Sequence, residues 1–172
     1  MPAAVGVGVG LSLLLQLNQE AIDLTVVRLQ VQPDGHVVES PAPVRLASAE
    51  AIILDVYGSL RFAGARTLQA RLPDPATSKQ TVVVLRLRGR THLGATSLVV
   101  LGGYAERLAA AEGHLYLSGI NPRLVKQLRT TQRIDPDRVT IVPATDTLLD
   151  STRLAFEQAE GWLADHTVRQ ES

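Results

Sequence analysis

The chain has 172 residues, of which 45% are hydrophobic and 20% are charged, as expected for one folded domain of ordinary size. The formal net charge is zero, which argues against a nucleic-acid-binding protein, because such a protein needs a basic footprint. Cysteine is absent, so disulfides and thiolate metal sites are excluded, and the four histidines show no metal-ligand spacing. We therefore expect no metal, no cofactor and no nucleic-acid partner.

The N-terminal residues 2–17 carry no charge and are mostly apolar, but the run is shorter than the ~20 residues that a membrane-spanning helix needs. No basic residues precede it and no A-x-A site follows it, so it is not a convincing signal peptide. Three interpretations are open: the last part of a transmembrane helix, a buried strand or helix, or a loosely attached tail. Gly6 and Gly10 have the spacing that lets membrane helices approach closely, whereas glycine at alternate positions disfavours a helix in water.

The first half of the chain predicts a hairpin, a buried strand and a helix that Pro73 closes. Residues 40–43, SPAP, indicate a linker or an irregular edge. In chain order the predicted elements are a strand at 24–31, a turn at 33–35, a returning strand at 36–40, a buried strand at 51–56 and a helix at 63–72.

The second half predicts strands and helices in strict alternation. Asn121 is the expected N-cap of a helix that has Pro122 at its first position. Thr147 and Asp150 form a candidate capping box for the final helix, whose apolar stripe is formed by Leu148, Ala155, Ala159 and Trp162. In chain order the predicted elements are a strand at 82–87, a helix at 96–112, a strand at 114–118, a helix from 122 to about 130, a strand at 139–142 and a helix ending near His166.

Helix 96–112 contains Gly102 and Gly103, each of which costs about 1 kcal/mol relative to alanine in a helix. Close packing of this helix on the sheet is the expected compensation. In strand 82–87, alternate residues Val83, Leu85 and Leu87 share one face. Three arginines, Arg86, Arg88 and Arg90, follow the same period on the other face. Arginines in this pattern more commonly form a solvated or partner-covered surface than a catalytic site.

The β-α alternation from residue 51 onward predicts an α/β fold with a mainly parallel sheet. In such folds the functional crevice lies at the carboxyl ends of the strands. Two loops, 89–97 and 118–121, should lie there, and each leads into a helix N-terminus whose first N–H groups have no partner within the helix. This arrangement, with Arg90 near the start of the first loop, is receptive to anions.

Four stretches in a fixed order carry a family resemblance: YGSLRFAGA (57–65), VVVLRLRGRTHLGATSLVVLGGYAERL (82–108), LYLSGINPRLVKQLRTT (115–131) and STRLAFEQAEGWL (151–163). Over residues 24–163 the chain resembles a STAS domain, specifically the one at the C-terminal end of bacterial SulP-type (sulfate permease family) anion transporters. The resemblance implies a small mixed or parallel sheet flanked by helices, as in anti-sigma-factor antagonists. It also implies that residues 1–20 are the end of the last membrane helix, residues 21–168 the STAS domain and residues 169–172 a tail.

In anti-sigma-factor antagonists an Asp-Ser-Ser/Thr-Gly motif at a helix N-terminus carries the phosphorylated hydroxyl, near a nucleotide-binding region. The matching positions here are Gly94, Ala95, Thr96 and Ser97, of which only Thr96 keeps the chemistry, and a plain N-cap role is the alternative for Thr96. The resemblance thus implies possible phosphorylation of Thr96 and weak nucleotide or anion binding, without hydrolysis. The residues expected to bind are Arg90, Thr91, Ala95, Thr96, Ser97, Gly119 and Asn121.

We therefore expect a non-enzymatic regulatory or assembly domain of an anion transporter, at the cytoplasmic face of the bacterial inner membrane. Its expected partners are the membrane domain of the permease, a second copy in a homodimer, and a weakly bound nucleotide. The alternative is a free-standing regulator of the anti-sigma-factor-antagonist type that binds a protein partner or a nucleotide. An α/β enzyme is disfavoured, because no nucleophile elbow, P-loop, metal cluster or acid–base pair is present in the sequence.

Overall fold

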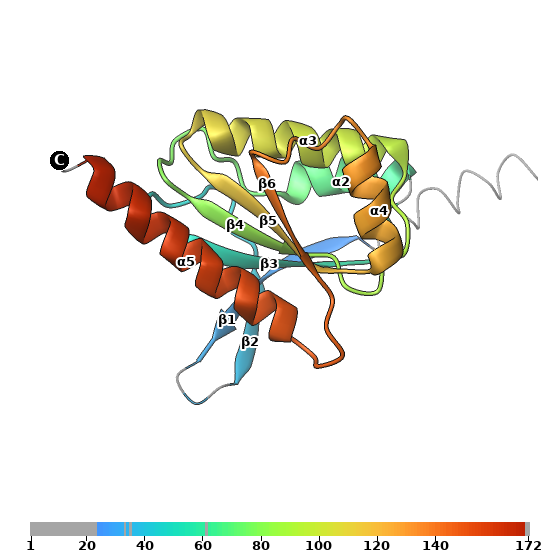
Figure 1. Cartoon of the computed structure of the whole chain (residues 1–172), viewed down its shortest axis with the longest axis horizontal. Coiled ribbons are helices and arrows are strands. Elements are labelled where there is room, and N and C mark those ends of the chain that lie inside the picture. Colours follow the sequence, from blue (N-terminus) through green and yellow to red (C-terminus); the bar gives the residue numbers. More distant parts are fainter. Residues whose placement is uncertain (1–23, 33, 35, 61, 171–172) are drawn as a thin grey trace, which may run out of the picture.

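The computed structural model describes residues 24–32, 34, 36–60 and 62–170, in which a six-stranded mixed sheet lies between two helical layers (Figure 1). The spatial strand order is β2-β1-β3-β4-β5-β6. The elements in chain order are β1 (Thr25–Val31), β2 (Val37–Pro41), β3 (Ala51–Tyr57), α2 (Phe62–Arg71), β4 (Val82–Arg86), α3 (Ala95–Ala110), β5 (His114–Ile120), α4 (Pro122–Thr130), β6 (Val139–Pro143) and α5 (Asp150–Gln170).

The sheet is parallel from β3 to β6, whereas β1 pairs antiparallel with both β2 and β3. The predicted hairpin and the predicted mainly parallel α/β class are therefore confirmed. The predictions for residues 2–17 lie outside the described residues. None of the helices that the structure describes is long and apolar enough to cross a membrane.

The central strands are buried on both faces, because helices cover both sides of a parallel sheet. One apolar cluster lies under α2, α3 and α4 and includes Val83, Leu85 and Leu87, as their spacing predicted. A second, smaller cluster lies under α5 and includes Val82 and Val84 of the same strand. In Figure 1, α5 crosses one face of the sheet, and α2, α3 and α4 lie on the other.

The start of α5 differs from the predicted capping box. Leu149, in a left-handed conformation with φ of 68°, precedes the helix, and its carbonyl accepts the backbone N–H of Thr152 (3.0 Å) and of Arg153 (2.8 Å). The helix therefore begins at Asp150, too late for Thr147 to cap it, and it continues past His166 to Gln170.

The predicted apolar stripe of α5 is only partly buried. Ala155 and Ala159 are fully buried against the sheet, and Trp162 is half-buried beside them. Leu148 lies before the helix and is 65% exposed, so its assignment to the stripe was wrong.

The two glycines of α3 have different surroundings, and neither supports the expected packing on the sheet. A Cβ added to Gly102 would lie 2.3 Å from the carbonyl oxygen of Arg133, in the connection between α4 and β6. A Cβ added to Gly103 would meet nothing within 4 Å. Gly102 is thus required by a backbone that crosses the helix, whereas Gly103 is not required by packing.

Candidate functional site

The candidate site lies where the carboxyl ends of β3, β4 and β5 meet at one edge of the sheet. The parallel register places Asp55, Arg86 and Ser118 next to one another at this edge. Two glycines with left-handed backbones allow the chain to turn there, Gly89 with φ of 81° and Gly119 with φ of 70°. Both predicted loops therefore begin at this edge.

Arg86 forms a buried ion pair with Asp55, which is 3% exposed. The Asp55 carboxylate also accepts the backbone N–H of Val56, at 2.9 Å. Because the two charges neutralise each other on neighbouring strands, Arg86 holds β3 and β4 together and is not free to bind an anion.

Arg90 fastens the first loop to the end of β3. Its two terminal nitrogens donate to the carbonyl oxygens of Val56 and Gly58, both at 2.8 Å. Its Nε is buried and has no hydrogen-bond partner among the described residues. Burial lowers the pKa of this guanidinium below its ordinary value, although the nearby Asp55 carboxylate opposes the change. Arg90 still supplies positive charge to the site, but two of its donors are already occupied.

A hollow of about 510 Å³ lies beside Arg90. Of the residues expected to bind an anion, only Arg90 and Thr91 line it, and both belong to the first loop. The other lining residues are Ser59, Leu60, Gly89, His92 and Gly94. The second loop, with Gly119 and Asn121, does not line this hollow.

Helix α3 begins one residue before Thr96, so Thr96 is not the N-cap that the sequence offered as one interpretation. Gly94 occupies the cap position, and no side chain caps it. Ala95 is exposed and Thr96 is half-buried in the first turn. Within the described part of the chain, the Thr96 hydroxyl makes no hydrogen bond.

Ser97 has a structural contact that the sequence pattern did not indicate. Its side chain is buried, and its hydroxyl donates to the carbonyl oxygen of Leu60 at 2.7 Å. The bond joins the first turn of α3 to the loop after β3. Ser97 therefore positions the loop, and its hydroxyl is not directed toward a ligand.

Gln127 of α4 holds the first loop on its other side. Its side-chain oxygen accepts the backbone N–H of Leu93 at 3.1 Å, and its side-chain nitrogen donates to the Leu93 carbonyl at 2.7 Å. No local pattern predicts such a pair, because its members are 34 residues apart. The α4 helix thus positions the loop that leads into α3.

The second loop leads into α4 as predicted. The Asn121 side chain accepts the backbone N–H of Arg123 at 3.0 Å, and Pro122 occupies the first position of the helix. Gly119 lies against Arg88, because a Cβ added there would be 3.2 Å from the Arg88 Cβ. One of the two helix N-termini is therefore capped by a side chain, and the other is not.

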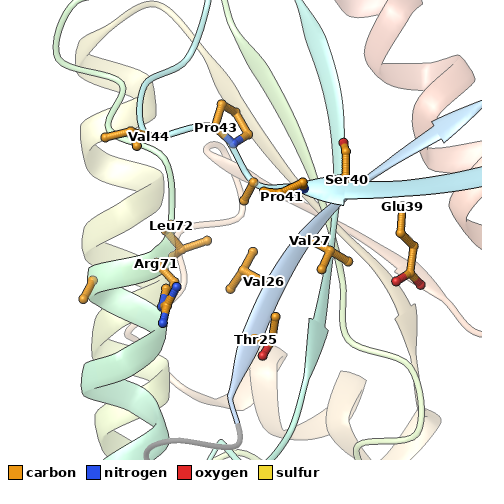
Figure 2. A pocket seen from close by; sticks show the side chains of 12 residues that line it. Thr25, Val26, Val27, Glu39, Ser40, Pro41, Pro43, Val44, Arg71 and Leu72 are labelled. Carbon is orange, nitrogen blue, oxygen red and sulfur yellow. The ribbon is translucent and has the colours of Figure 1, made fainter.

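A larger hollow, of about 700 Å³, lies elsewhere, between the start of β1, the end of β2 and the end of α2 (Figure 2). Its lining is mainly apolar, and its two charged side chains, Arg71 and Glu39, lie on opposite sides in Figure 2. No set of polar groups converges there, so we assign the candidate site to the strand ends instead.

The sequence of residues 43–136 matches the STAS domain family. The match covers more than half of the chain and includes β3, β4, α3, β5 and α4, which together build the strand-end site. The chain belongs to the STAS domain family. The resemblance to a STAS domain and the fold that it implied are therefore confirmed. Comparison with curated proteins gave no match.

Two solved structures share the fold of this STAS domain. One is described as the overall structure of SLC26A9, with a TM-score of 0.58, 13% identity and coverage of 92% of this chain and 29% of that chain. The other is the murine Solute Carrier 26 family member A9 anion transporter in the inward-facing state. Its TM-score is 0.64 and its identity 15%, and the alignment covers 90% of this chain and 25% of that chain. This chain thus spans less than a third of either protein.

Proposed function

We propose that the chain is the cytoplasmic STAS domain of a SulP-type anion transporter, with a regulatory or assembly role and no catalytic activity. The observation that carries the proposal is that nearly the whole chain shares its fold with one part of SLC26A9 structures, one of which is named as an anion transporter. The uncharged run at 2–17 supports it, since that run is the length of a partial membrane helix.

The use made of the polar residues at the strand ends also supports a non-enzymatic role. Arg86, Arg90 and Ser97 are engaged in contacts that fix the loops. Such contacts suit a rigid surface that meets another protein domain. In this proposal, that domain is the membrane domain of the permease, at the inner membrane of a bacterium, and a homodimer is the second proposed assembly.

Membrane fractionation tests this proposal. The full chain and a chain that lacks residues 1–20 should be expressed with a C-terminal green fluorescent protein and extracted with alkaline carbonate. We expect the full chain to stay with the membrane and to fluoresce, because the fluorescent protein folds on the cytoplasmic side. The truncated chain should be soluble.

Two substitutions sharpen the fractionation. Val9→Arg places a charge within the apolar run, where insertion costs about 2.5–3.5 kcal/mol, and should release the full chain. Val44→Arg, at a domain residue that is 85% exposed, is the matched control and should not. A full chain as soluble and monodisperse as the truncated one would favour the free-standing regulator instead.

We also propose that the hollow beside Arg90 binds an anion or a nucleotide weakly. The uncapped N-terminus of α3 supports this, because its free N–H groups and about half a positive charge lie next to Arg90. Thr96, with no hydrogen bond from its hydroxyl within the described residues, is the candidate for phosphorylation. Gly119 and Asn121 do not line the hollow, and we propose them as secondary contacts in the second loop.

Titration with GDP, ATP and sulfate, followed by backbone amide shifts, tests this binding. We expect shifts in residues 90–97, with smaller shifts near residues 119–121, and weaker binding by Thr96→Ala. Thr130→Ala, in the last turn of α4, is the control and should bind as the unmodified chain does. Flat titrations at millimolar ligand would falsify the binding and leave a purely structural or protein-binding domain.

A further inference from the structure

The α4 helix has a basic face with no acidic counterpart. Arg123, Lys126 and Arg129 are exposed and spaced by three residues, so they share one side of the helix. Leu124 and Leu128, on the other side, are buried in the core. No ion pair to these three cations occurs within the described part of the chain, and the sequence has no acidic residue from 113 to 134.

This concentration of charge does not follow from composition, because the net charge of the chain is zero. The opposite face of the sheet, covered by α5, has the reverse bias. Asp150, Glu157 and Glu160 lie along α5, where Arg153 pairs with the first two, at 3.2 and 2.8 Å. Positive charge is thus in excess on α4 and negative charge on α5, and these two helices lie on opposite faces of the sheet (Figure 1).

The basic helix lies at the end of the sheet where the described chain begins. Thr25, at the start of β1, pairs with Tyr57 at the carboxyl end of β3. Helix α4 starts at Pro122, directly after β5 ends at this same edge. Residues 18–23 separate Leu24 from the apolar run, and six residues span at most about 20 Å.

The proposed function therefore sets how far this edge can lie from a bilayer. If the apolar run ends in the membrane, the start of β1 lies within about 20 Å of the surface. Helix α4 has 9 residues, so it is about 13 Å long. Electrostatic attraction reaches about 8–10 Å at physiological salt, so modest tilting of the domain brings the basic face into range.

We propose that the basic face of α4, formed by Arg123, Lys126 and Arg129, contacts the anionic phospholipid headgroups of the bilayer and fixes the orientation of the STAS domain. The inference rests on the proposed function, because the membrane attachment supplies the proximity. Arginine can hold a phosphate through two parallel hydrogen bonds, and lysine adds a point charge. The acidic α5 layer is repelled by the same lipids and faces away.

Fluorescence energy transfer to the headgroups tests the orientation. The chain has no cysteine, so a single exposed position can be labelled, Gln132→Cys beside α4 or Gln158→Cys on α5. The full chain is placed in nanodiscs of phosphatidylcholine, with or without phosphatidylglycerol, that carry a headgroup acceptor dye. We expect transfer from position 132 to rise with phosphatidylglycerol and fall again at high salt, and transfer from position 158 to fall.

Charge variants identify the responsible residues. Each Lys or Arg near an anionic surface shifts the docked population about five-fold, so the combined substitution Arg123→Gln, Lys126→Gln and Arg129→Gln should reduce it roughly 100-fold. The matched control removes three exposed cations outside α4, Arg45→Gln, Lys79→Gln and Arg107→Gln, of which the last two line a hollow away from the start of β1, and should keep the lipid response.

Several results would overturn the proposal. Equal transfer in neutral and anionic discs would do so, as would an equal effect of the two sets of substitutions. A response to added polyglutamate in neutral discs, without a response to phosphatidylglycerol, would assign the basic face to an acidic protein instead. A chain that neither kind of disc retains would refute the membrane attachment, and this inference with it. Failure of the proposed function is thus distinguished from failure of the lipid contact alone.

Discussion

Arg86, Arg88 and Arg90 share one face of the sequence pattern, but each has a different environment. Arg86 pairs with a buried carboxylate, and its side chain is only 13% exposed. Arg88 makes a long hydrogen bond, 3.5 Å, to the Thr147 carbonyl, and Arg90 binds the carbonyls at the end of β3. The three side chains that were expected on a solvated or partner-covered face therefore each contact another segment of the domain.

Arg86→Gln should destabilise the protein by about 3–5 kcal/mol, because it leaves the Asp55 carboxylate buried without its partner. Adding Asp55→Asn should recover part of this loss, since no buried charge then remains. Arg153→Gln is the control, because its ion pairs are exposed, and should leave the midpoint almost unchanged. Urea unfolding measures all three, and similar losses for Arg86→Gln and Arg153→Gln would contradict the assignment.

His114 should make stability depend on pH. Its Nε2 lies 2.9 Å from the Thr140 hydroxyl, and its ring contacts those of Tyr116 and Trp162, with centroids 5.1 and 5.7 Å away. Burial, with a smaller contribution from the charge of His166, lowers the His114 pKa below its ordinary value. The folded state thus binds fewer protons than the unfolded state.

Stability from neutral His114 is fully present above the unfolded pKa of about 6.5 and is lost as the pH falls below that value. The free energy of unfolding should therefore decrease from pH 7 toward pH 5. His114→Gln should flatten this decrease, and His36→Gln, at an exposed position, should not. Identical pH profiles for the two variants would contradict the role of His114.

At the scale of one helix, α3 allows a matched pair of substitutions. Gly102→Ala should destabilise the protein by about 1–3 kcal/mol, because the new methyl group meets the Arg133 carbonyl. Gly103→Ala should stabilise it by up to about 1 kcal/mol, since only helix propensity changes there. Thermal unfolding distinguishes the two variants. Increased stability in both would contradict the prediction, because it would mean that the α4–β6 connection moves away from the new methyl group.

Helix α5 is held to the sheet by its small residues as much as by its one tryptophan. Trp162 is half-buried and stacks on His166, with ring centroids 3.7 Å apart. Trp162→Ala should therefore lower the free energy of unfolding, but by less than the ~3–5 kcal/mol of a fully buried tryptophan. Ala159→Leu, at a fully buried position, should cost about 1–3 kcal/mol through overpacking. Denaturant midpoints compare them, and no change for either variant would show that α5 is not docked.

At the scale of the whole molecule, the two apolar clusters share the same strands. Val83 and Val84 are neighbours in β4, yet they belong to opposite clusters. Loss of either helical layer should therefore expose the strands that support the other layer.

Unfolding should accordingly be a single transition. Trp162 is the only tryptophan, so its fluorescence reports on α5, whereas far-ultraviolet circular dichroism reports on all helices. We expect coincident urea curves by the two methods. An earlier fluorescence transition would show that α5 separates first and that the two layers are not coupled.

The sequence by itself determined the order of strands and helices, because apolar periodicity, Pro122, Asn121 and the turn residues at 33–35 act on their immediate neighbours in the chain. It also carried the family resemblance, since that lies in contiguous stretches. It placed the candidate site at the carboxyl ends of parallel strands, which follows from β-α alternation.

Only the tertiary structure decided which residues of that site are free. Residues of β3 bind Arg86 and Arg90, and Gln127 binds Leu93. The two members of each of these hydrogen-bonded pairs are 31 to 34 residues apart in sequence. The same holds for Gly102. No side chain fits at this position, because the backbone of the connection between α4 and β6 passes too close to it. Local patterns cannot encode these contacts, because they depend on strand register and on how the connecting loops cross the packed helices.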